Sequence, residues 1–486
     1  MTPFYSITEG TIKVPLLKVE EFLQDSGYHF YVVSPESTII VKVEDNKVTE
    51  VPAIDIYRYI MDQAKKCELE NEDDREDLFD KVSNSQYRII SNLSIILQPI
   101  ELNFIEDTQE MSYIFYKNVV VTITKDAIET KSYNELTGHI WKNQILDREY
   151  TGDLPPEIHE ALADVIFYRF LEEITLSTNS DCLISIIGYL LHRYKRRDFA
   201  KAVIFYDANI DMTDPSGGSG KTLLSLSLGH IRRLVQEDGR RNSLSGRFDL
   251  DRLAIGDEIF LMDDLVKDYP LERLFALITG DCVVEKKNKQ RFSIPFEKSP
   301  KLLITSNYCV VKEGDSYTRR VIEFVLDNTF NLKKTPRKTY GHEFFTDWDA
   351  DQWHGFDNTM ILAIQFYLKN GVVEQANGRK HYQLQNLTSD EFITFAGSFE
   401  MRKRYDKKEL LENFLNQNPK HLKVENNTFT RWMKLYAQYK NWNTTESHSG
   451  NINYIQFYQE EEAVEGTTGE ATEELKVEAT EQVSAA

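Results

Sequence analysis

Residues 214–223 read DPSGGSGKTL, and their types and order are those of a loop that holds a polyphosphate. Gly217, Gly218 and Gly220 carry no Cβ, so the backbone can turn several N–H groups toward phosphate oxygens in a small volume. Pro215 stands where the usual pattern opens with glycine. It removes one N–H at the outer edge of the loop, where a fixed φ can begin a turn. The inner glycines are therefore expected to form the cradle.

The residues that follow the glycines add a positive charge and a metal ligand. Lys221 is expected to reach the β- and γ-phosphates of a nucleoside triphosphate, and the Thr222 hydroxyl is expected to ligate Mg²⁺. ATP and Mg²⁺ are thus the predicted ligands. The predicted nucleotide-binding residues are Ser216, Gly217, Gly218, Ser219, Gly220, Lys221, Thr222 and Leu223.

Two downstream segments end in polar side chains that could act on the same ligand. EIFLMDDL at 258–265 is an apolar run that closes on Asp263 and Asp264, and KLLITSNY at 301–308 reaches Asn307. In a parallel sheet, the carboxyl ends of strands deliver side chains to a ligand. We expect Asp263 to hold Mg²⁺ through water, Asp264 to orient the attacking water and Asn307 to sense the γ-phosphate. Taken alone, each segment also fits a strand that passes into a turn.

Two basic segments lie near these strands. VVEKKNKQRFSI at 283–294 resembles a hairpin whose two β-type arms flank a basic tip, which could touch a phosphate backbone or be only a solvated turn. SYTRRVIEF at 316–324 contains Arg319 and Arg320. In an oligomer, either arginine could act on a neighbour's γ-phosphate; otherwise the pair is a basic strand edge. The candidate nucleic-acid contacts are Lys286, Lys287, Lys289 and Arg291.

Secondary-structure patterns predict how these residues are positioned. KAVIFYD at 201–207 is a β-type run and TLLSLSLGHIRRLVQ at 222–236 fits a helix, so the glycine loop lies between a strand and a helix, as the motif requires. Residues 150–200 hold two apolar stretches at helical spacing, PPEIHEALADVIFYRFLEEI and DCLISIIGYLLHRYKRR. The predicted fold is an α/β P-loop NTPase core at 201–335, preceded by a helical segment.

The flanking regions carry no chemical motif of their own. Residues 1–130 alternate β-type runs (HFYVV, STIIVKV, YRIISNL, YIFYKNVVVTIT) with one acidic helical stretch, CELENEDDREDLFDKV, which predicts an α+β domain of unknown role. Residues 336–389 are interpreted as a linker with an aromatic-rich helix. Residues 390–458 contain KKELLENFLNQN, TFTRWMKLYAQYKNW and NYIQFYQ, and helix–helix–strand predicts a small winged-helix-like module. Residues 459–486 form an acidic tail that is expected to be disordered.

Composition narrows the class of protein. The chain has 486 residues, of which 41% are hydrophobic and 28% charged, as in soluble globular proteins. It contains no apolar run of about 18 residues and begins without a secretory signal pattern, so no membrane partner is expected. Four scattered cysteines suit a reducing cytoplasm.

The net charge of −21 by itself argues against a nucleic-acid partner, but the charge is unevenly distributed along the chain. Residues 460–486 contain nine Glu and one Lys, whereas short basic clusters interrupt the rest of the chain. Each cluster alone could be a solvated face. Net charge therefore leaves the partner undecided. The clusters are HRYKRR, RRLVQEDGRR, EKKNKQR and RKRYDKK.

Together, GGSGKT, FLMDDL, the basic hairpin and LLITSN resemble the A, B, B-prime and C motifs of superfamily three helicases, which are AAA+-type ring motors of viruses, phages and plasmids. Asn307 follows Lys221 by 86 residues, a spacing similar to that family. The sequence is most similar to the helicase portion of phage, plasmid and poxvirus-type primase-helicases, over about 155–330. Residues 1–130 have neither zinc-binding cysteines nor a clear catalytic acid triad, so we do not assign priming activity.

The resemblance implies an ATP-dependent replicative helicase that assembles as a ring, with a hexamer expected, and draws single-stranded nucleic acid, DNA favoured, through its pore. Each active site would then combine Lys221, the two aspartates and Asn307 with Arg319 or Arg320 of a neighbouring subunit. A phage or prophage protein would work in the bacterial cytoplasm, with other replication proteins as candidate partners. The alternatives are a loader, packaging or defence ATPase, an origin-binding protein that acts through 390–458, and an RNA helicase.

Overall fold

The chain forms two compact units, Met1–Tyr382 and Gln383–Ala486, in a computed structural model. Across the described residues, no helix combines the length and apolar character needed to cross a membrane. The structure describes residues 3–34, 37–69, 71–152, 162–175, 180–207, 219–241, 249–266, 269–286, 291–307, 315–327, 329–331, 333–374, 384–385, 387–450 and 452–459.

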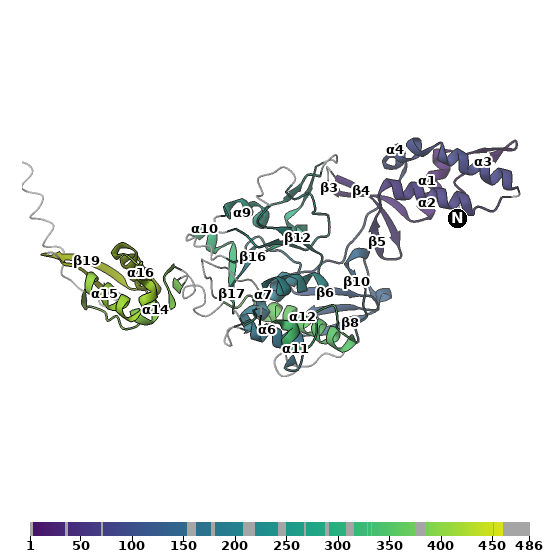
Figure 1. Ribbon diagram of the computed structural model, residues 1–486. Helices are drawn as coiled ribbons and strands as arrows, with labels where there is room; N and C mark the ends of the chain where they lie inside the picture. Colours follow the sequence, from purple (N-terminus) through teal and green to yellow (C-terminus); the bar gives the residue numbers. More distant parts are fainter. Residues whose placement is uncertain are drawn as a thin grey trace, which may run out of the picture. The chain divides into compact units, whose positions relative to one another are not determined.

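The first part of the larger unit is a helical layer beside a small sheet (Figure 1). The sheet has the strand order β3-β4-β5-β9. HFYVV and STIIVKV form β3 and β4 as predicted, and the acidic stretch forms α3. The bounds are β1 Ser6–Thr8, β2 Thr11–Lys13, α1 Leu16–Asp25, β3 Tyr28–Ser34, β4 Ser37–Glu44, β5 Lys47–Glu50, α2 Ala53–Lys66, α3 Glu72–Ser83, α4 Gln86–Ile96 and β9 Ile140–Trp141.

The prediction of a strand at YRIISNL is wrong, because this segment lies in helix α4. Its buried residues are Ile89 and Leu93, while Ser91 between them is exposed. A strand would place all three on one face, so this pattern is that of a helix. Both side chains pack into the apolar cluster that α1, α2 and α3 share. Burial of this face therefore decided the conformation over β-propensity.

A second sheet follows, with the strand order β10-β6-β7-β8. YIFYKNVVVTIT supplies two of its strands, which pair antiparallel from Met111 opposite Thr124 to Phe115 opposite Val120. The bounds are β6 Met111–Tyr116, β7 Val120–Thr124, β8 Ile128–Lys131 and β10 Ile145–Leu146.

The centre of the larger unit is a five-stranded parallel sheet with the order β12-β13-β16-β11-β17. Its three middle strands are mostly apolar and almost entirely buried, as expected for parallel strands covered on both faces. KAVIFYD, EIFLMDDL and KLLITSNY form β11, β13 and β16 as predicted. The bounds are β11 Ala202–Asp207, β12 Leu234–Asp238, β13 Ile259–Asp263, β16 Lys301–Ser306 and β17 Val321–Leu326.

Helices cover one face of this sheet. Val203 and Phe205 point into an apolar cluster with α6 (Ile166–Glu173), α7 (Ser180–Leu191) and α12 (Ala350–Asn370), as does one face of the β6–β7 pair. Gly188 lets α7 and α12 approach closely, since a Cβ there would lie 2.0 Å from the carbonyl oxygen of Ala363. Residues 350–370, interpreted from sequence as part of a linker region, thus belong to the packed core of the larger unit.

The other face of the sheet carries smaller elements. Ile204 and Tyr206 alternate with Val203 and Phe205 and pack on the side of α9 and the hairpin β14–β15. The remaining elements of this part are α8 Lys221–Ser227, α9 Glu272–Thr279, β14 Cys282–Val284, β15 Phe292–Ile294, α10 Asp315–Thr318 and α11 Pro336–Tyr340.

The helix predicted at 222–236 is correct only for its first part. Helix α8 ends at Ser227, and the chain enters strand β12 at Leu234. Arg232 explains the change, because its buried guanidinium donates to the carbonyl oxygens of Leu191 and Tyr113 at 2.6 and 2.8 Å. These tertiary contacts hold the segment away from a helical path.

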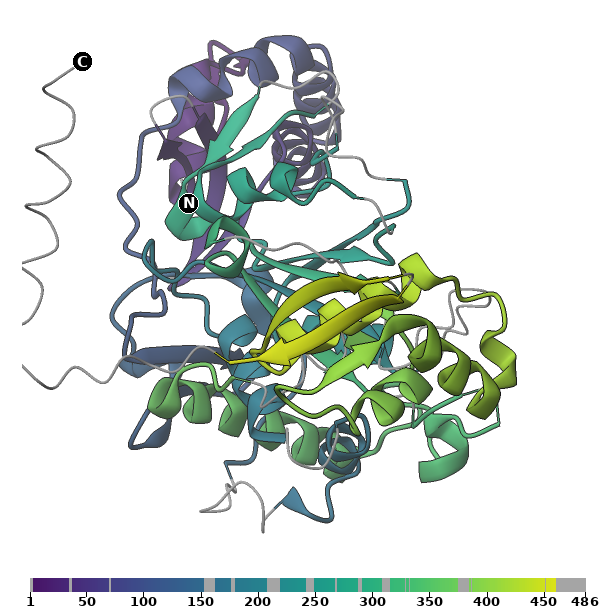
Figure 2. The ribbon, with the colours of Figure 1, turned by 90° about the vertical axis from the view of Figure 1, so that its left-hand side faces the viewer.

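The smaller unit has its own apolar core. Among its described residues, helices α14, α15 and α16 pack with an antiparallel sheet of order β18-β20-β19, and Figure 2 shows β19 and β20 as a long yellow hairpin. The two predicted helices and the strand at its end are present; α14, β18 and β19 were not predicted. The bounds are α14 Asp390–Ala396, β18 Arg404–Asp406, α15 Lys407–Gln417, α16 Asn426–Tyr439, β19 Asn443–Ser449 and β20 Ile452–Tyr458.

Candidate functional site

The carboxyl ends of three adjacent strands bring the predicted catalytic residues together. Strand β11 ends at Asp207, β13 ends at Asp263, and Asn307 follows the last residue of β16. These strands are parallel neighbours in the order β13-β16-β11, so their carboxyl ends lie at one edge of the sheet. Helix α8 begins at Lys221, on the chain segment that follows β11. Four of the six predicted catalytic residues therefore share this edge: Lys221, Asp263, Asp264 and Asn307.

Lys221 is a buried cation held by two side chains. Its ammonium donates to a carboxylate oxygen of Asp207 and, at 2.8 Å, to the amide oxygen of Asn307. The hydroxyl of Ser219 donates to the other oxygen of Asp207, which is also buried. Sequence reasoning missed Asp207, although its position as the acidic last residue of the strand before the loop was visible. The structure thus gives Lys221 a carboxylate partner within its own chain.

Gly220 shapes the end of the loop that is described. Its φ of 97° lies in the left-handed region, and a Cβ there would lie 3.0 Å from the ring of Phe170. Both features favour glycine at this position. Thr222 is exposed, and Leu223 packs against the main apolar cluster. The predictions for Ser216, Gly217 and Gly218, and the turn at Pro215, lie outside the described residues.

Asp264 connects to Lys221 through Asn307. The amide nitrogen of Asn307 donates to Asp264 at 2.8 Å, while its amide oxygen accepts from Lys221. The other carboxylate oxygen of Asp264 pairs with Arg240. Asp264 has φ of 62°, which is uncommon for a non-glycine residue, and its N–H donates to the Thr305 hydroxyl at 2.8 Å. A strained backbone is often found at functional sites, and here it aims this carboxylate at Asn307.

Arg240 was not predicted as a site residue. It lies just after β12, in a cluster that the sequence analysis could interpret as a solvated face. Only the adjacency of β12 and β13 in the sheet brings its guanidinium to Asp264.

Asp263 faces a different set of partners. Its two carboxylate oxygens accept from the Thr305 hydroxyl at 2.6 Å and from the Gln236 amide at 3.0 Å. Among the described residues, no three His, Cys, Asp or Glu side chains converge as a metal cluster. Asp263 offers a single carboxylate, and Mg²⁺ in proteins is usually bound by one or two carboxylates together with waters and substrate phosphates.

The predicted basic hairpin has its two arms. Cys282 pairs with Ile294 and Val284 with Phe292, which confirms the antiparallel arms β14 and β15. The ammonium of Lys286 lies 5.9 Å from the centre of the Phe292 ring. The other two predicted lysine contacts of the tip, Lys287 and Lys289, lie outside the described residues; Arg291 begins the returning arm.

Arg319 and Arg320 lie at the edge of the sheet that the amino ends of its strands form, opposite to the carboxyl ends near Lys221. They precede β17, whose first residue pairs with Ala202 at the start of β11, whereas Asp207 is at its end. Five residue steps of strand span roughly 16 Å. Arg319 donates to the Asp315 carbonyl at 3.2 Å, and Arg320 donates to the Ser316 hydroxyl at 2.7 Å. The structure does not bring either arginine to the Lys221 site of the same chain.

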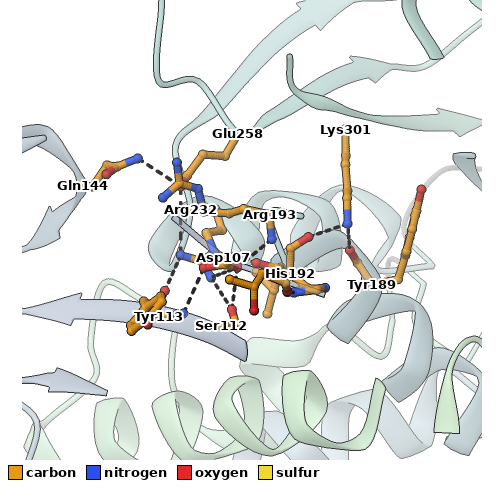
Figure 3. A network of polar contacts seen from close by, with 12 residues as sticks. Asp107, Ser112, Tyr113, Gln144, Tyr189, His192, Arg193, Arg232, Glu258 and Lys301 are labelled. Atoms are coloured by element: carbon orange, nitrogen blue, oxygen red, sulfur yellow. Dashed lines mark hydrogen bonds and ion pairs between the residues drawn. The ribbon is translucent and has the colours of Figure 1, made fainter. Parts of the chain in front are cut away.

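A buried polar network lies at that same opposite edge (Figure 3). Asp107 accepts from the Ser112 hydroxyl at 2.6 Å and from the Arg193 N–H at 2.8 Å, and it lies 3.5 Å from the Arg232 guanidinium. Lys301, the first residue of β16, donates to the carbonyl oxygen of Tyr189 at 2.5 Å. The network ties the segment before β6 to α7 and to the amino ends of the central strands. Its role in the fold is structural.

A cavity of about 290 Å³ opens beside this network. Aromatic residues Tyr31, Phe104 and Trp141 line one part, and Arg193 and Lys195 line another. It includes none of the residues predicted to bind phosphate, so it is distinct from the site around Lys221.

His192 makes the stability of this network dependent on pH. Its Nε2 lies 2.7 Å from the Thr108 carbonyl oxygen, and burial lowers its pKa from 6.5 to about 4. The folded protein therefore keeps the ring neutral at pH values where the unfolded chain takes up a proton. Stability is full above about pH 6.5 and falls as the pH drops toward 4.

We expect the thermal unfolding midpoint to fall between pH 6.5 and 4, and to fall less in His192→Gln, which can still donate to Thr108. Burial also lowers the pKa of His230, to about 4, and that of His29, so both act in the same direction and the variant should lose only part of the slope. Calorimetry across this range measures both proteins. If the unfolding midpoint of the variant changes with pH as steeply as that of the original protein, His192 does not contribute to the pH dependence.

No protein-family model matches the chain, and no curated protein matches it. Two solved structures of the NrS-1 C-terminal region, both described as its A form in the apo state, are similar in structure. The first is 14% identical with a TM-score of 0.40, and covers 91% of this chain and 100% of its own. The second is 13% identical with a TM-score of 0.41, and covers 91% and 99%. At these values the likeness supports no conclusion about activity.

Proposed function

We propose that the protein is an ATP-dependent replicative helicase of a phage or a similar mobile element, working as a ring on single-stranded DNA. One observation carries the proposal. A continuous chain of side chains, Asp207–Lys221–Asn307–Asp264, spans the carboxyl ends of adjacent parallel strands and joins the three motifs that the sequence analysis assigned to nucleotide hydrolysis.

The charges in this chain suit a bound triphosphate. Lys221 would exchange its contact with Asp207 for phosphate oxygens, and Thr222 with Asp263 would hold Mg²⁺. The bound metal would neutralise charge that develops on the phosphates. Asp264 would accept a hydrogen bond from the attacking water and orient it. Asn307, which lies between Asp264 and Lys221, would contact the γ-phosphate.

The place of the two arginines supports a shared site between subunits. Arg319 and Arg320 lie about a strand length from the Lys221 edge of their own chain, as the pairing of β17 with β11 requires. In a closed head-to-tail ring, opposite faces of neighbouring subunits meet, so one of these arginines would complete the neighbour's site.

The test is unwinding of forked DNA with ATP, alongside a forked RNA and a blunt duplex. ATP-dependent strand displacement on forked DNA is the expected result. Displacement confined to RNA would assign an RNA helicase, and ATP hydrolysis without displacement of either fork would point to a loader or packaging ATPase.

Neutralising the hairpin tip separates its role from that of the ATP site. In the variant with Lys286, Lys287 and Lys289 changed to Ala, we expect unwinding to be lost and ATP binding to persist, because none of the three belongs to the phosphate cradle. Single-strand affinity should fall, and its log–log salt slope should flatten by roughly 0.7 for each lost contact.

A matched variant controls for net charge. It replaces three exposed lysines of the first part of the chain, Lys13, Lys65 and Lys66, with Ala. This control should keep its unwinding rate and salt slope. If the hairpin variant behaves like the control, the tip is solvated surface and the nucleic-acid path lies elsewhere.

A further inference from the structure

Within the smaller unit, residues 383–459 have a small excess of positive charge, whereas residues 460–486 are strongly acidic. Residues 383–459 contain ten Lys and Arg against eight Asp and Glu, whereas the whole chain has a net charge of −21. A local excess of positive charge favours an anionic partner for residues 383–459. The question is which surface of the unit would meet it.

Helix α16 has one face in the core and one face in solvent. Its buried residues pack among the other helices and β20. The opposite face carries Asn427, Arg431, Lys434 and Gln438, all exposed and spaced by four, three and four residues. At 100° per residue these four side chains fall within about 60° of one another. The face is therefore a single polar stripe along the helix.

The four side chains are of the kinds that contact DNA bases. Arginine and lysine donate to the O6 and N7 acceptors of guanine, and asparagine and glutamine form paired hydrogen bonds with adenine. A helix fits the major groove of B-form DNA, which is about 12 Å wide. The major groove of an A-form RNA duplex is too deep and narrow for this contact.

The surface does not suit a single strand or an apolar protein partner. Single-strand sites use exposed aromatic rings on which bases stack. In the described part of this unit, the large apolar side chains that are strongly exposed are Met401, Leu422 and Ile452, none of them aromatic and none on the stripe. Within the described residues, no ion pair involves Arg431, which leaves its charge available to an anion.

The hairpin β19–β20 lies beside this helix. Glu446 of β19 pairs with Lys434 of the stripe and also with Lys407 at the start of α15. The outer part of the hairpin presents polar residues, including His448, which lies 3.0 Å from Asn453. A polar hairpin next to a groove-binding helix can contact the DNA backbone. The ion pairs with Glu446 keep Lys434 and Lys407 from binding phosphates.

We propose that the stripe Asn427–Arg431–Lys434–Gln438 is a docking surface for the major groove of duplex DNA, and that Glu446 restrains its affinity. This surface goes beyond the proposed motor on single strands, because it would bind duplex DNA that has not been unwound. It does not depend on ATP hydrolysis, so it can fail or succeed independently of the helicase proposal.

The test is fluorescence anisotropy of a short labelled DNA duplex of mixed sequence, without nucleotide, with unlabelled single strands present as competitor. The full chain is used throughout. Arg431→Ala is expected to weaken duplex binding about tenfold and to flatten the salt slope by roughly 0.9. Glu446→Gln is expected to strengthen binding, because it releases Lys434 and Lys407 toward phosphates.

Lys440→Ala is the matched control. Lys440 ends the same helix but lies over the rings of Tyr436 and Tyr439, on another face. It should leave binding nearly unchanged. Equal losses in the Arg431 and Lys440 variants would overturn the assignment of the stripe, as would unchanged binding in Arg431→Ala. Equal affinity for an RNA duplex would overturn docking in the major groove.

Discussion

Lys221→Ala is expected to lose ATP hydrolysis by on the order of 10²-fold or more, because it removes the cation that would bind the β- and γ-phosphates. The structure adds a second expected effect. Lys221 is the partner of Asp207, and both side chains are buried. Leaving a buried carboxylate without its partner costs on the order of 3 kcal/mol of stability. Loss of activity alone would therefore not separate catalysis from folding.

A double variant separates the two effects. Asp207→Asn combined with Lys221→Ala removes both charges, so it should recover most of the thermal stability that the single variant loses. Its ATP hydrolysis should remain as low as in Lys221→Ala. If activity returns together with stability, Lys221 acts in the fold and not on the phosphates.

The single variant Lys221→Ala also tests whether the site is shared between subunits. Rings mixed from Lys221→Ala chains and Arg319→Ala or Arg320→Ala chains would contain some interfaces with an intact lysine and an intact arginine. Partial recovery of hydrolysis in such mixtures is expected. Activity no higher than that of either parent, in rings shown to be mixed, would place the whole site within one chain.

The strands that carry the site could be predicted from sequence because their signal is local. β11 and β13 are apolar runs that end in Asp207 and Asp263, and β16 has an apolar centre and ends at the residue before Asn307. Burial on both faces of a parallel sheet produces this pattern. The meeting of the polar side chains at one edge followed from the expected direction of the strands.

The contacts that depend on distant parts of the chain could not be predicted in this way. Asp207 as the partner of Lys221, and Arg240 as the partner of Asp264, become visible only when the order of the strands is known. The switch from helix to strand before Leu234 depends on Arg232, whose acceptors lie at Leu191 and Tyr113. The residues around Arg232 have the spacing of a helix, and nothing in that local pattern indicates the two distant acceptors.

Asp264→Asn is expected to bind ATP and fail to hydrolyse it, with a loss in rate of about 10²- to 10⁴-fold, since a carboxylate that orients and deprotonates water becomes a neutral amide. The substitution should leave the backbone at this position unchanged. Asp264 has φ of 62°, and asparagine tolerates this left-handed conformation as well as aspartate does. Its N–H can still donate to Thr305, so the turn after β13 should persist.

The partners of the carboxylate decide how the result is interpreted. Asn307 donates to one oxygen of Asp264, and the new amide oxygen can still accept this bond. Arg240 loses its ion pair, but it is exposed, so stability should change little. Asp263→Asn provides the comparison, because Asp263 faces Thr305 and Gln236 and is assigned to the metal. Asp263→Asn should weaken Mg²⁺-dependent ATP binding, whereas Asp264→Asn should not. If Asp264→Asn also abolishes binding, as measured by titration with labelled ATP, the roles of the two aspartates are reversed.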